Sequence, residues 1–116
     1  MKTLLTTCLA LFLGSSLVHA ETVLSCKKQN AFVSSSFYWV QIEKNPDESL
    51  SFQYGIGIDT QMLEVYFNSP VSASADGSYA YQDANYSLLA IVNHSRLSFT
   101  LKDSRQSVTR SKFICQ

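Results

Sequence analysis

The chain has 116 residues, carries nine basic and nine acidic residues, and is 46% hydrophobic. This composition excludes a disordered chain, and the balanced charge excludes bulk electrostatic attraction to nucleic acid. A chain of this length is expected to form one domain.

Residues 1 to 20 have the features of a secretory signal peptide. Lys2 precedes an apolar run over residues 4 to 13, which is followed by a Gly-Ser-Ser break and a small-residue cleavage site ending at Ala20. The apolar run is shorter than the ~20 residues that span a bilayer, and no later segment approaches that length. We therefore predict a secreted or periplasmic protein with no transmembrane segment, in which residues 21 to 116 form a single β domain.

Two cysteines remain after signal removal, because Cys8 leaves with the signal peptide. They are Cys26, near the start of the mature chain, and Cys115, one position from its end. A lone pair of cysteines in an oxidising compartment is expected to form a disulfide. A structural zinc site needs four ligands, and His94 is the only histidine left in the mature chain. The sequence therefore predicts a disulfide, no metal site and no cofactor.

Alternation of apolar and polar residues is the dominant pattern of the mature chain. In residues 49 to 59, SLSFQYGIGID, five alternate positions from Leu50 to Ile58 carry large apolar side chains. The preceding run over residues 36 to 44 alternates in the same way, and the NPDE between the two runs suits a type I turn with Pro46 at its second position. The two runs are predicted to form a hairpin.

Similar short runs continue to the end of the chain, separated by polar turn segments such as Asn68-Ser69-Pro70. The later runs are MLEVYFN, VSASA, SYAYQ, YSLLAIV, RLSFTLK and VTRSKFIC. We predict an all-β fold of about eight strands with at most a turn or two of helix. A small antiparallel barrel is favoured, with a sandwich as the alternative, because a disulfide between the first and last strands would join the two free edges.

Catalytic motifs are missing from the sequence. It has no Ser-His-Asp order, no glycine-rich phosphate loop and no metal-ligand spacing. His94 falls in a predicted turn, where a polar residue is common. Asp76 and Asp83 lie at opposite ends of one short strand, and a glycosidase-type acid and nucleophile pair is only one of many interpretations of that spacing. Asn85 and Asn93 begin Asn-X-Ser sequons that would accept glycans in a eukaryotic source. We predict that the protein is not an enzyme.

Acidic residues concentrate in the middle of the chain. Positions 43 to 83 hold seven acidic residues and one cation, Lys44, whereas the rest of the mature chain holds seven cations and two acidic residues. One interpretation is that these are ordinary solvated turns. The other is a bipolar surface whose acidic half steers a cationic partner.

The segment VSASADGSYAYQD is the most distinctive local feature. Its Asp76-Gly77 dipeptide predicts a two-residue type I′ turn. That register pairs Ser74 with Tyr79 and Ser72 with Tyr81. The two tyrosines would then share one face of the hairpin with two serines.

The opposite face of this predicted hairpin carries Ala73 and Ala80. If the alanines pack inward, the tyrosines form an exposed recognition surface. If the hairpin is inverted, the rings are buried and only their hydroxyls reach the rim. The candidate partner-binding residues are Ser72, Ser74, Asp76, Gly77, Tyr79 and Tyr81.

The layout resembles the periplasmic inhibitors of animal-type lysozyme. In that family a small secreted barrel has a cysteine in its first strand, another near its end, and a central SASGARY-like hairpin. Here Ser72-Ala73-Ser74 is followed by Ala75 to Tyr79, and the family's lysine-glycine motif is missing from residues 80 to 90. The resemblance implies that Ser74 and Tyr79 contact a basic lysozyme.

Three functions remain open from the sequence. The first is a non-enzymatic protein that binds another, cationic protein, such as lysozyme, through the acidic, tyrosine-bearing middle strands. The second is a carrier whose barrel encloses a small apolar ligand, with Phe52, Tyr54 and Trp39 lining the cavity. The third is an envelope-associated structural protein that uses the cationic strands.

Overall fold

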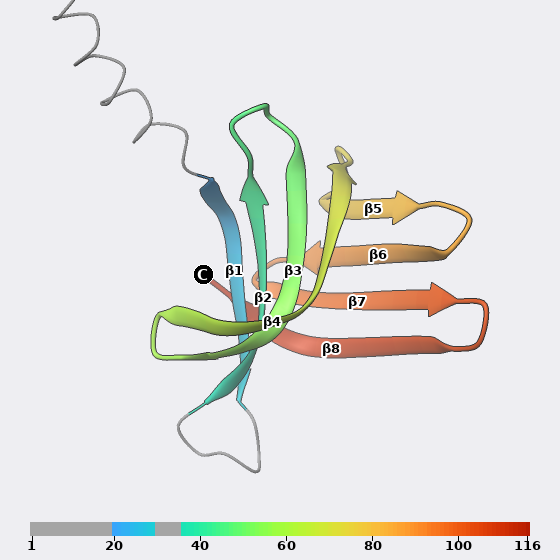
Figure 1. Cartoon of the computed structure of the whole chain (residues 1–116). Coiled ribbons are helices and arrows are strands. Elements are labelled where there is room, and N and C mark those ends of the chain that lie inside the picture. Colours follow the sequence, from blue (N-terminus) through green and yellow to red (C-terminus); the bar gives the residue numbers. More distant parts are fainter. Residues whose placement is uncertain (1–19, 30–35) are drawn as a thin grey trace, which may run out of the picture.

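The computed structural model describes residues 20–29 and 36–116, which contain eight strands and no helix (Figure 1). The predicted signal peptide lies outside the described residues, except for Ala20. Within the described ranges, no helix has the length and apolar character needed to cross a membrane. The strands are β1 (Glu21–Gln29), β2 (Phe37–Lys44), β3 (Leu50–Ile58), β4 (Gln61–Ala73), β5 (Ser78–Gln82), β6 (Tyr86–Asn93), β7 (Arg96–Asp103) and β8 (Ser107–Cys115).

The strands form one closed antiparallel barrel in which neighbours pair in chain order and β8 returns to β1. The predicted small barrel of about eight strands is therefore confirmed. In Figure 1, β1 to β3 run across the direction of β5 to β8, and β4 bends from the first group toward the second. The two halves meet at narrow seams, because β4 pairs with β5, and β1 with β8, over two residue pairs each.

Large apolar side chains fill the interior because alternate residues of each strand face inward. The ring centroids of Phe52 in β3 and Phe99 in β7 lie 5.1 Å apart in an edge-to-face arrangement, so aromatic packing joins the two halves. The buried hydrophobic core consists of Cys26, Val40, Ile42, Phe52, Val71, Leu88, Ala90, Leu97, Phe99 and Phe113.

The predicted disulfide between Cys26 and Cys115 is confirmed, with an S–S bond of 2.05 Å. The two cysteines are also register partners across the seam between β1 and β8. Lys27 and Ile114 form the other residue pair of this seam. The disulfide therefore holds the barrel closed at one of its two shortest seams.

The hairpin of β3 and β4 contains two irregularities in its register. The pairs Tyr54 with Phe67 and Gly55 with Val65 leave Tyr66 as an extra residue in β4. Such β-bulges bend a strand and redirect its side chains. A Cβ on Gly55 would lie 1.8 Å from the carbonyl oxygen of Glu64, so the close approach of the two strands requires glycine here.

Strand β4 is continuous from Gln61 to Ala73, and the predicted break at Asn68-Ser69-Pro70 is wrong. Pro70 pairs with Ser51 of β3. Among the described residues, β4 has no second partner strand until Ser72, where β5 begins to pair. Proline lacks an N–H donor and is tolerated at such an open edge.

The register predicted for the hairpin of β4 and β5 is also wrong. Ala73 pairs with Tyr79 and Ser72 with Ala80, which shifts the pairing by one residue. The amide of Gly77 donates to the carbonyl of Ser74 at 3.2 Å, and Gly77 has a positive φ of 89°. The loop is therefore a three-residue connection with glycine in the left-handed position, instead of a two-residue type I′ turn.

Candidate binding surface

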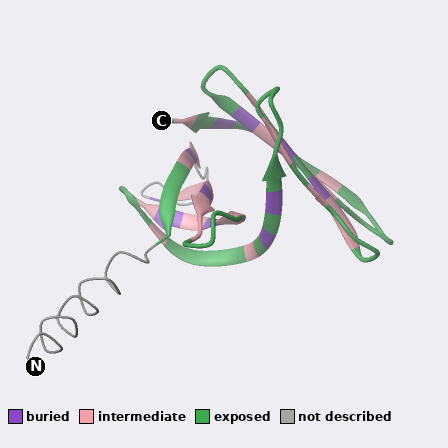
Figure 2. Cartoon of the chain, turned by 90° about the horizontal axis from the view of Figure 1, so that it is seen from above, coloured by how far each residue is buried: buried purple, intermediate pink, exposed green. Residues whose placement is uncertain are grey.

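The first half of β4 exposes three large hydrophobic side chains, which we call the β4 patch: Leu63, Val65 and Tyr66. Their exposed fractions are 57%, 46% and 52%. Leu63 and Tyr66 are the extra residues at the two bulges. In Figure 2, β4 is a long arc that is mostly exposed along its first half and buried near its end. The bulges thus turn apolar side chains toward solvent.

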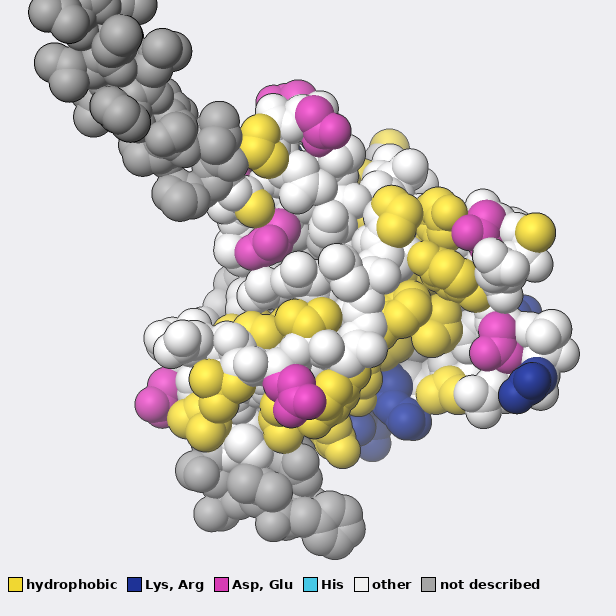
Figure 3. All heavy atoms as spheres, viewed as in Figure 1, with side chains coloured by type: hydrophobic (Ala, Val, Ile, Leu, Met, Phe, Trp, Pro, Cys, Tyr) yellow, Lys and Arg dark blue, Asp and Glu magenta, His cyan; other side chains and the backbone are white. Residues whose placement is uncertain are grey.

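An aromatic cleft of about 290 Å³ opens beside the β4 patch. It separates β3 and β4 from β7 and β8. In Figure 3, hydrophobic side chains form a band from the first half of β4 toward β5 to β8, and Lys and Arg side chains border it. The cleft is lined by Tyr54, Tyr66, Phe67, Phe99, Leu101, Val108 and Arg110.

Arg110 is the charged group of this cleft, and its guanidinium lies near the hydroxyl of Tyr54. Burial raises the pKa of Tyr54 above its ordinary value, although the nearby guanidinium of Arg110 partly opposes this shift. Tyr54 therefore keeps its proton at neutral pH and can act as a hydrogen-bond donor.

The acidic segment contains few cations of its own, although Lys27 of β1 donates a hydrogen bond to the backbone carbonyl of Asp59. Lys44, the only cation between residues 43 and 83, lies 3.1 Å from Glu48, and this is the one ion pair within residues 20–29 and 36–116. Glu64 lies between Leu63 and Val65 and is exposed. A carboxylate is therefore part of the surface that carries the β4 patch.

The candidate residues Ser72, Ser74, Asp76 and Gly77 are all exposed. The Asp76 carboxylate accepts hydrogen bonds from the hydroxyl and amide of Ser78, at 2.7 and 3.1 Å. These bonds hold the pKa of Asp76 below its usual value. Asp76 therefore stabilises its own turn. Ser72 and Ser74 are exposed to solvent at the base of this turn.

Tyr79 and Tyr81 do not project outward, so the alternative in which they form an exposed recognition surface is wrong. Their cross-strand partners in β6 are Ala90 and Leu88, which are buried, and both rings are half-buried against the core. The hydroxyl of Tyr81 donates to Asp83 at 2.8 Å. This hydrogen bond is the main reason that the pKa of Tyr81 is raised. The structure matches the inverted hairpin, with rings inward and a hydroxyl at the rim.

Truncation of these rings should therefore reduce stability. We expect Tyr79→Ala to lower the free energy of unfolding by about 1 to 3 kcal/mol, because a half-buried ring loses its core contacts. Tyr81→Ala should act in the same direction. Tyr66→Ala is the matched control and should lower the free energy of unfolding less, because the Tyr66 side chain is 52% exposed whereas Tyr79 packs against the core. Urea unfolding followed by circular dichroism measures all three variants, and a Tyr79→Ala protein as stable as the parent would contradict the inward placement.

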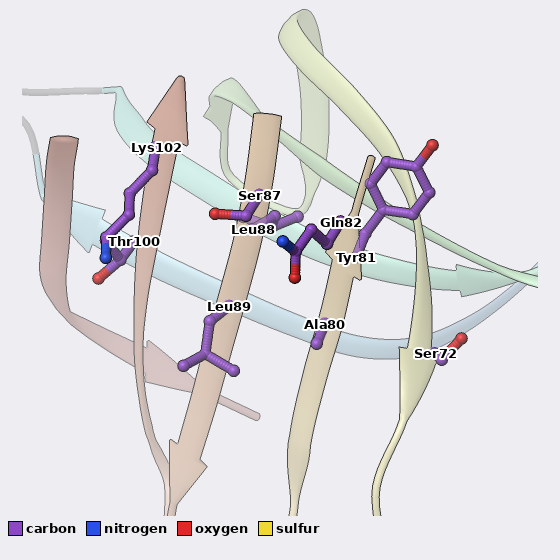
Figure 4. Close-up of a pocket in the computed structure, with 9 residues that line it drawn as sticks. All are labelled: Ser72, Ala80, Tyr81, Gln82, Ser87, Leu88, Leu89, Thr100 and Lys102. Atoms are coloured by element: carbon purple, nitrogen blue, oxygen red, sulfur yellow. The ribbon is translucent and has the colours of Figure 1, made fainter. Parts of the chain in front are cut away.

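A second depression, of about 800 Å³, lies on the outer face of β5 to β7 (Figure 4). Of the candidate residues, Ser72 and Tyr81 contribute to its lining, at the margin where β4 and β5 meet. Small side chains such as Ala80 and Thr100 contribute to this face, and Figure 4 shows Ala80 on β5 and Thr100 on β7, with β6 between them. The depression is broad and open, with a mixed lining that includes Gln82, Ser87 and Lys102, and it does not enclose a small molecule as a specific site usually does.

The cavity suggested for a carrier is not arranged as predicted. Phe52 is fully buried within the core, and Tyr54 lines the aromatic cleft at its margin. Trp39 lies on the opposite face of β2 from Val40, under the ammonium of Lys27, which is 4.9 Å from its ring. The three aromatic residues therefore do not line one cavity.

The described residues contain no cluster of three or more His, Cys, Asp or Glu side chains that could hold a metal ion. His94 is exposed in the two-residue turn between β6 and β7, with a positive φ of 60°. Its geometry is that of a turn residue.

Sequence analysis missed the β4 patch and Arg110. The available signal was the near-continuous apolar run MLEVYF, which breaks the alternation expected of a regular strand. Two glycines at alternate positions of β3, Gly55 and Gly57, face this run and mark the close approach. Together these features mark an irregular hairpin, but they do not identify which residues are bulged.

In comparisons with protein-family models, curated proteins and solved structures, nothing matches the chain.

Proposed function

We propose that this chain is an exported, non-enzymatic binding protein that contacts a cationic partner protein through the β4 patch. The main support is the exposure of Leu63, Val65 and Tyr66 together on one strand. Exposed clusters of large apolar side chains are typical of interaction sites. Aromatic anchors such as tyrosine often carry much of the binding energy.

The charge of the surrounding segment favours a cationic partner. Glu64 lies within the β4 patch, and Asp59 lies in the turn that precedes β4. Lys44 is already paired with Glu48, and the ammonium of Lys27 donates a hydrogen bond to the backbone carbonyl of Asp59, so the charge argument depends mainly on Glu64. Complementary charge accelerates encounter and fixes the orientation of the partner, whereas apolar contacts supply most of the affinity.

Structural features of the open edge of β4 favour contact through side chains over the pairing of a partner's strand with β4. Two bulges and Pro70 interrupt the row of backbone donors and acceptors that a partner strand would need. Proteins commonly use bulges, proline and charge to prevent edge strands from pairing indiscriminately. A second copy of the chain is therefore a less suitable occupant than a different, cationic protein.

A cationic lysozyme is the first partner to test, in view of the resemblance described above. Binding is measured by biolayer interferometry at low and high salt. We expect the double variant Leu63→Ser/Tyr66→Ser to bind at least about tenfold more weakly than the parent, because each anchor contributes roughly 1 kcal/mol or more. Binding should also weaken as salt rises.

The matched control is Leu89→Ser/Ile91→Ser, which alters two side chains of similar exposure on the outer face of β6. This control should bind as the parent does. Equal losses in both double variants would remove the β4 patch from the proposal. Failure to bind any cationic protein at low salt, or concentration-dependent self-association that the Leu63/Tyr66 variant abolishes, would contradict the proposed partner.

A further inference from the structure

Two cations start from strand positions that face the inside of the barrel, and of these the Arg110 side chain is exposed and Lys28 is partly buried. Arg110 of β8 pairs with the buried Phe99, and Lys28 of β1 pairs with Tyr38, whose ring packs against the core. Residues directly opposite in an antiparallel pair share a face of the sheet. Both cationic side chains therefore begin on the face that the barrel uses for its core.

Among the described residues, both cations lie near aromatic rings and neither forms an ion pair with a carboxylate. Arg110 and Tyr54 line the same cleft, and the Lys28 ammonium lies 5.9 Å from the centroid of the Phe113 ring. The Tyr54 and Phe113 centroids are 6.2 Å apart, so the two cations approach adjoining rings. In the part of the chain that the structure describes, the only ion pair is elsewhere, between Lys44 and Glu48. The local positive charge is therefore not neutralised by an acidic side chain.

Much of the remaining cleft lining is apolar. Phe67, Phe99, Leu101 and Val108 contribute to it, and the cleft volume is about 290 Å³. If each non-hydrogen atom takes about the 30 Å³ of a liquid water molecule, this volume accommodates roughly ten of them. The charge and the wall together require a ligand with an anionic end and an apolar body.

We propose that the aromatic cleft binds a small free carboxylate with an aliphatic or aromatic body, whose carboxylate meets Arg110. The body packs against Phe99, Leu101 and Val108. Arginine pairs with carboxylates through paired N–H donors, and the Tyr54 hydroxyl can donate a further hydrogen bond. Lys28 adds positive potential from β1. An acidic protein side chain fits less well, because its one or two methylene groups leave the apolar wall uncovered.

This proposal goes beyond the binding of a partner protein and depends on a different charged group. The β4 patch and the cleft share Tyr66, but Arg110 and Lys28 take no part in the proposed protein contact. The two activities can therefore be separated by variants. Leu63→Ser should leave carboxylate binding intact, and Arg110→Gln should leave protein binding intact.

Octanoate is a suitable probe, because it is a carboxylate of about ten non-hydrogen atoms, matched to the estimated capacity of the cleft. Titration of the mature protein is followed by isothermal calorimetry and by amide chemical shifts, at submicellar concentration and low salt. We expect saturable binding with shifts concentrated in β3, β4, β7 and β8. Acetate, which has the charge alone, and 1-octanol, which has the chain alone, should each bind at least about tenfold more weakly.

The charge dependence is tested with Arg110→Gln and its matched control Arg105→Gln, which removes the same charge from the exposed turn between β7 and β8. Arg110→Gln should weaken octanoate binding by about tenfold or more, and Arg105→Gln should not. Leu101→Gln, which keeps both cations, should also weaken binding. Thermal unfolding of each variant verifies the fold. The absence of saturable octanoate binding, equal affinity of the two arginine variants, or binding of octanol as tight as octanoate would overturn the proposal.

Discussion

Gly55→Ala is expected to destabilise the protein by about 3 kcal/mol or more, at the upper end of the cost of forcing extra atoms into a packed site. The added Cβ would lie 1.8 Å from the Glu64 carbonyl oxygen and 2.9 Å from the Val65 Cα. Both atoms belong to the backbone, so a change of side-chain rotamer cannot relieve the contact. The strands β3 and β4 must separate instead.

The consequences of this change should extend to the β4 patch. Separation of the strands removes the close approach that accompanies the bulges, so Leu63 and Tyr66 would lose their common orientation. Urea unfolding measures the stability, and Thr60→Ala, at an exposed position in the turn of the same hairpin, is the control. A Gly55→Ala protein with parental stability would show that β3 and β4 can part at no cost.

Much of the barrel could be predicted from alternation alone. Strands β3 and β7 have one clear apolar face, and the core residues Phe52 and Phe99 lie on those faces. The disulfide followed from the number of cysteines and their positions. These features depend on local pattern and on a single covalent pairing, so a single sequence contains the information.

The register of the β4 and β5 hairpin could not be predicted in this way. Asp76-Gly77 suits both a two-residue turn and a three-residue loop with glycine in the left-handed position. The pairing of β5 with β6 decides between them, because it extends over five residue pairs, compared with two for β4. Leu88 and Ala90 of β6 then place the tyrosine rings on the inner face. The deciding contacts are therefore tertiary.

The β4 patch and the cleft could not be predicted from the sequence for a related reason. A bulge is defined by two strands, and the extra residue in β4 becomes evident only when its pairing with Gly55 is known. Pro70 normally indicates a break, yet it lies inside β4 because that edge has no neighbouring strand at this position among the described residues. Arg110 reads as an ordinary polar position until Phe99 is found opposite it.

Loss of the disulfide should be the second largest effect. We expect Cys26→Ala/Cys115→Ala to lower the free energy of unfolding by about 2 to 4 kcal/mol, because the crosslink joins residues 89 positions apart and restricts the unfolded chain. The other seven strand junctions remain, so far-ultraviolet circular dichroism should keep its β signal. Denaturant unfolding of the parent, with and without reductant, provides the matched comparison.

The effect of the disulfide should be concentrated at the seam between β1 and β8. Only two residue pairs link these strands, and one of them is the cysteine pair itself. Phe113, two residues before Cys115, contacts the Tyr54 ring and lies under Lys28. Amide hydrogen exchange in the double variant should therefore accelerate in β1 and β8 more than in β6 and β7. Uniform acceleration throughout the barrel, or two reactive thiols in the parent under oxidising conditions, would contradict a disulfide that closes this seam.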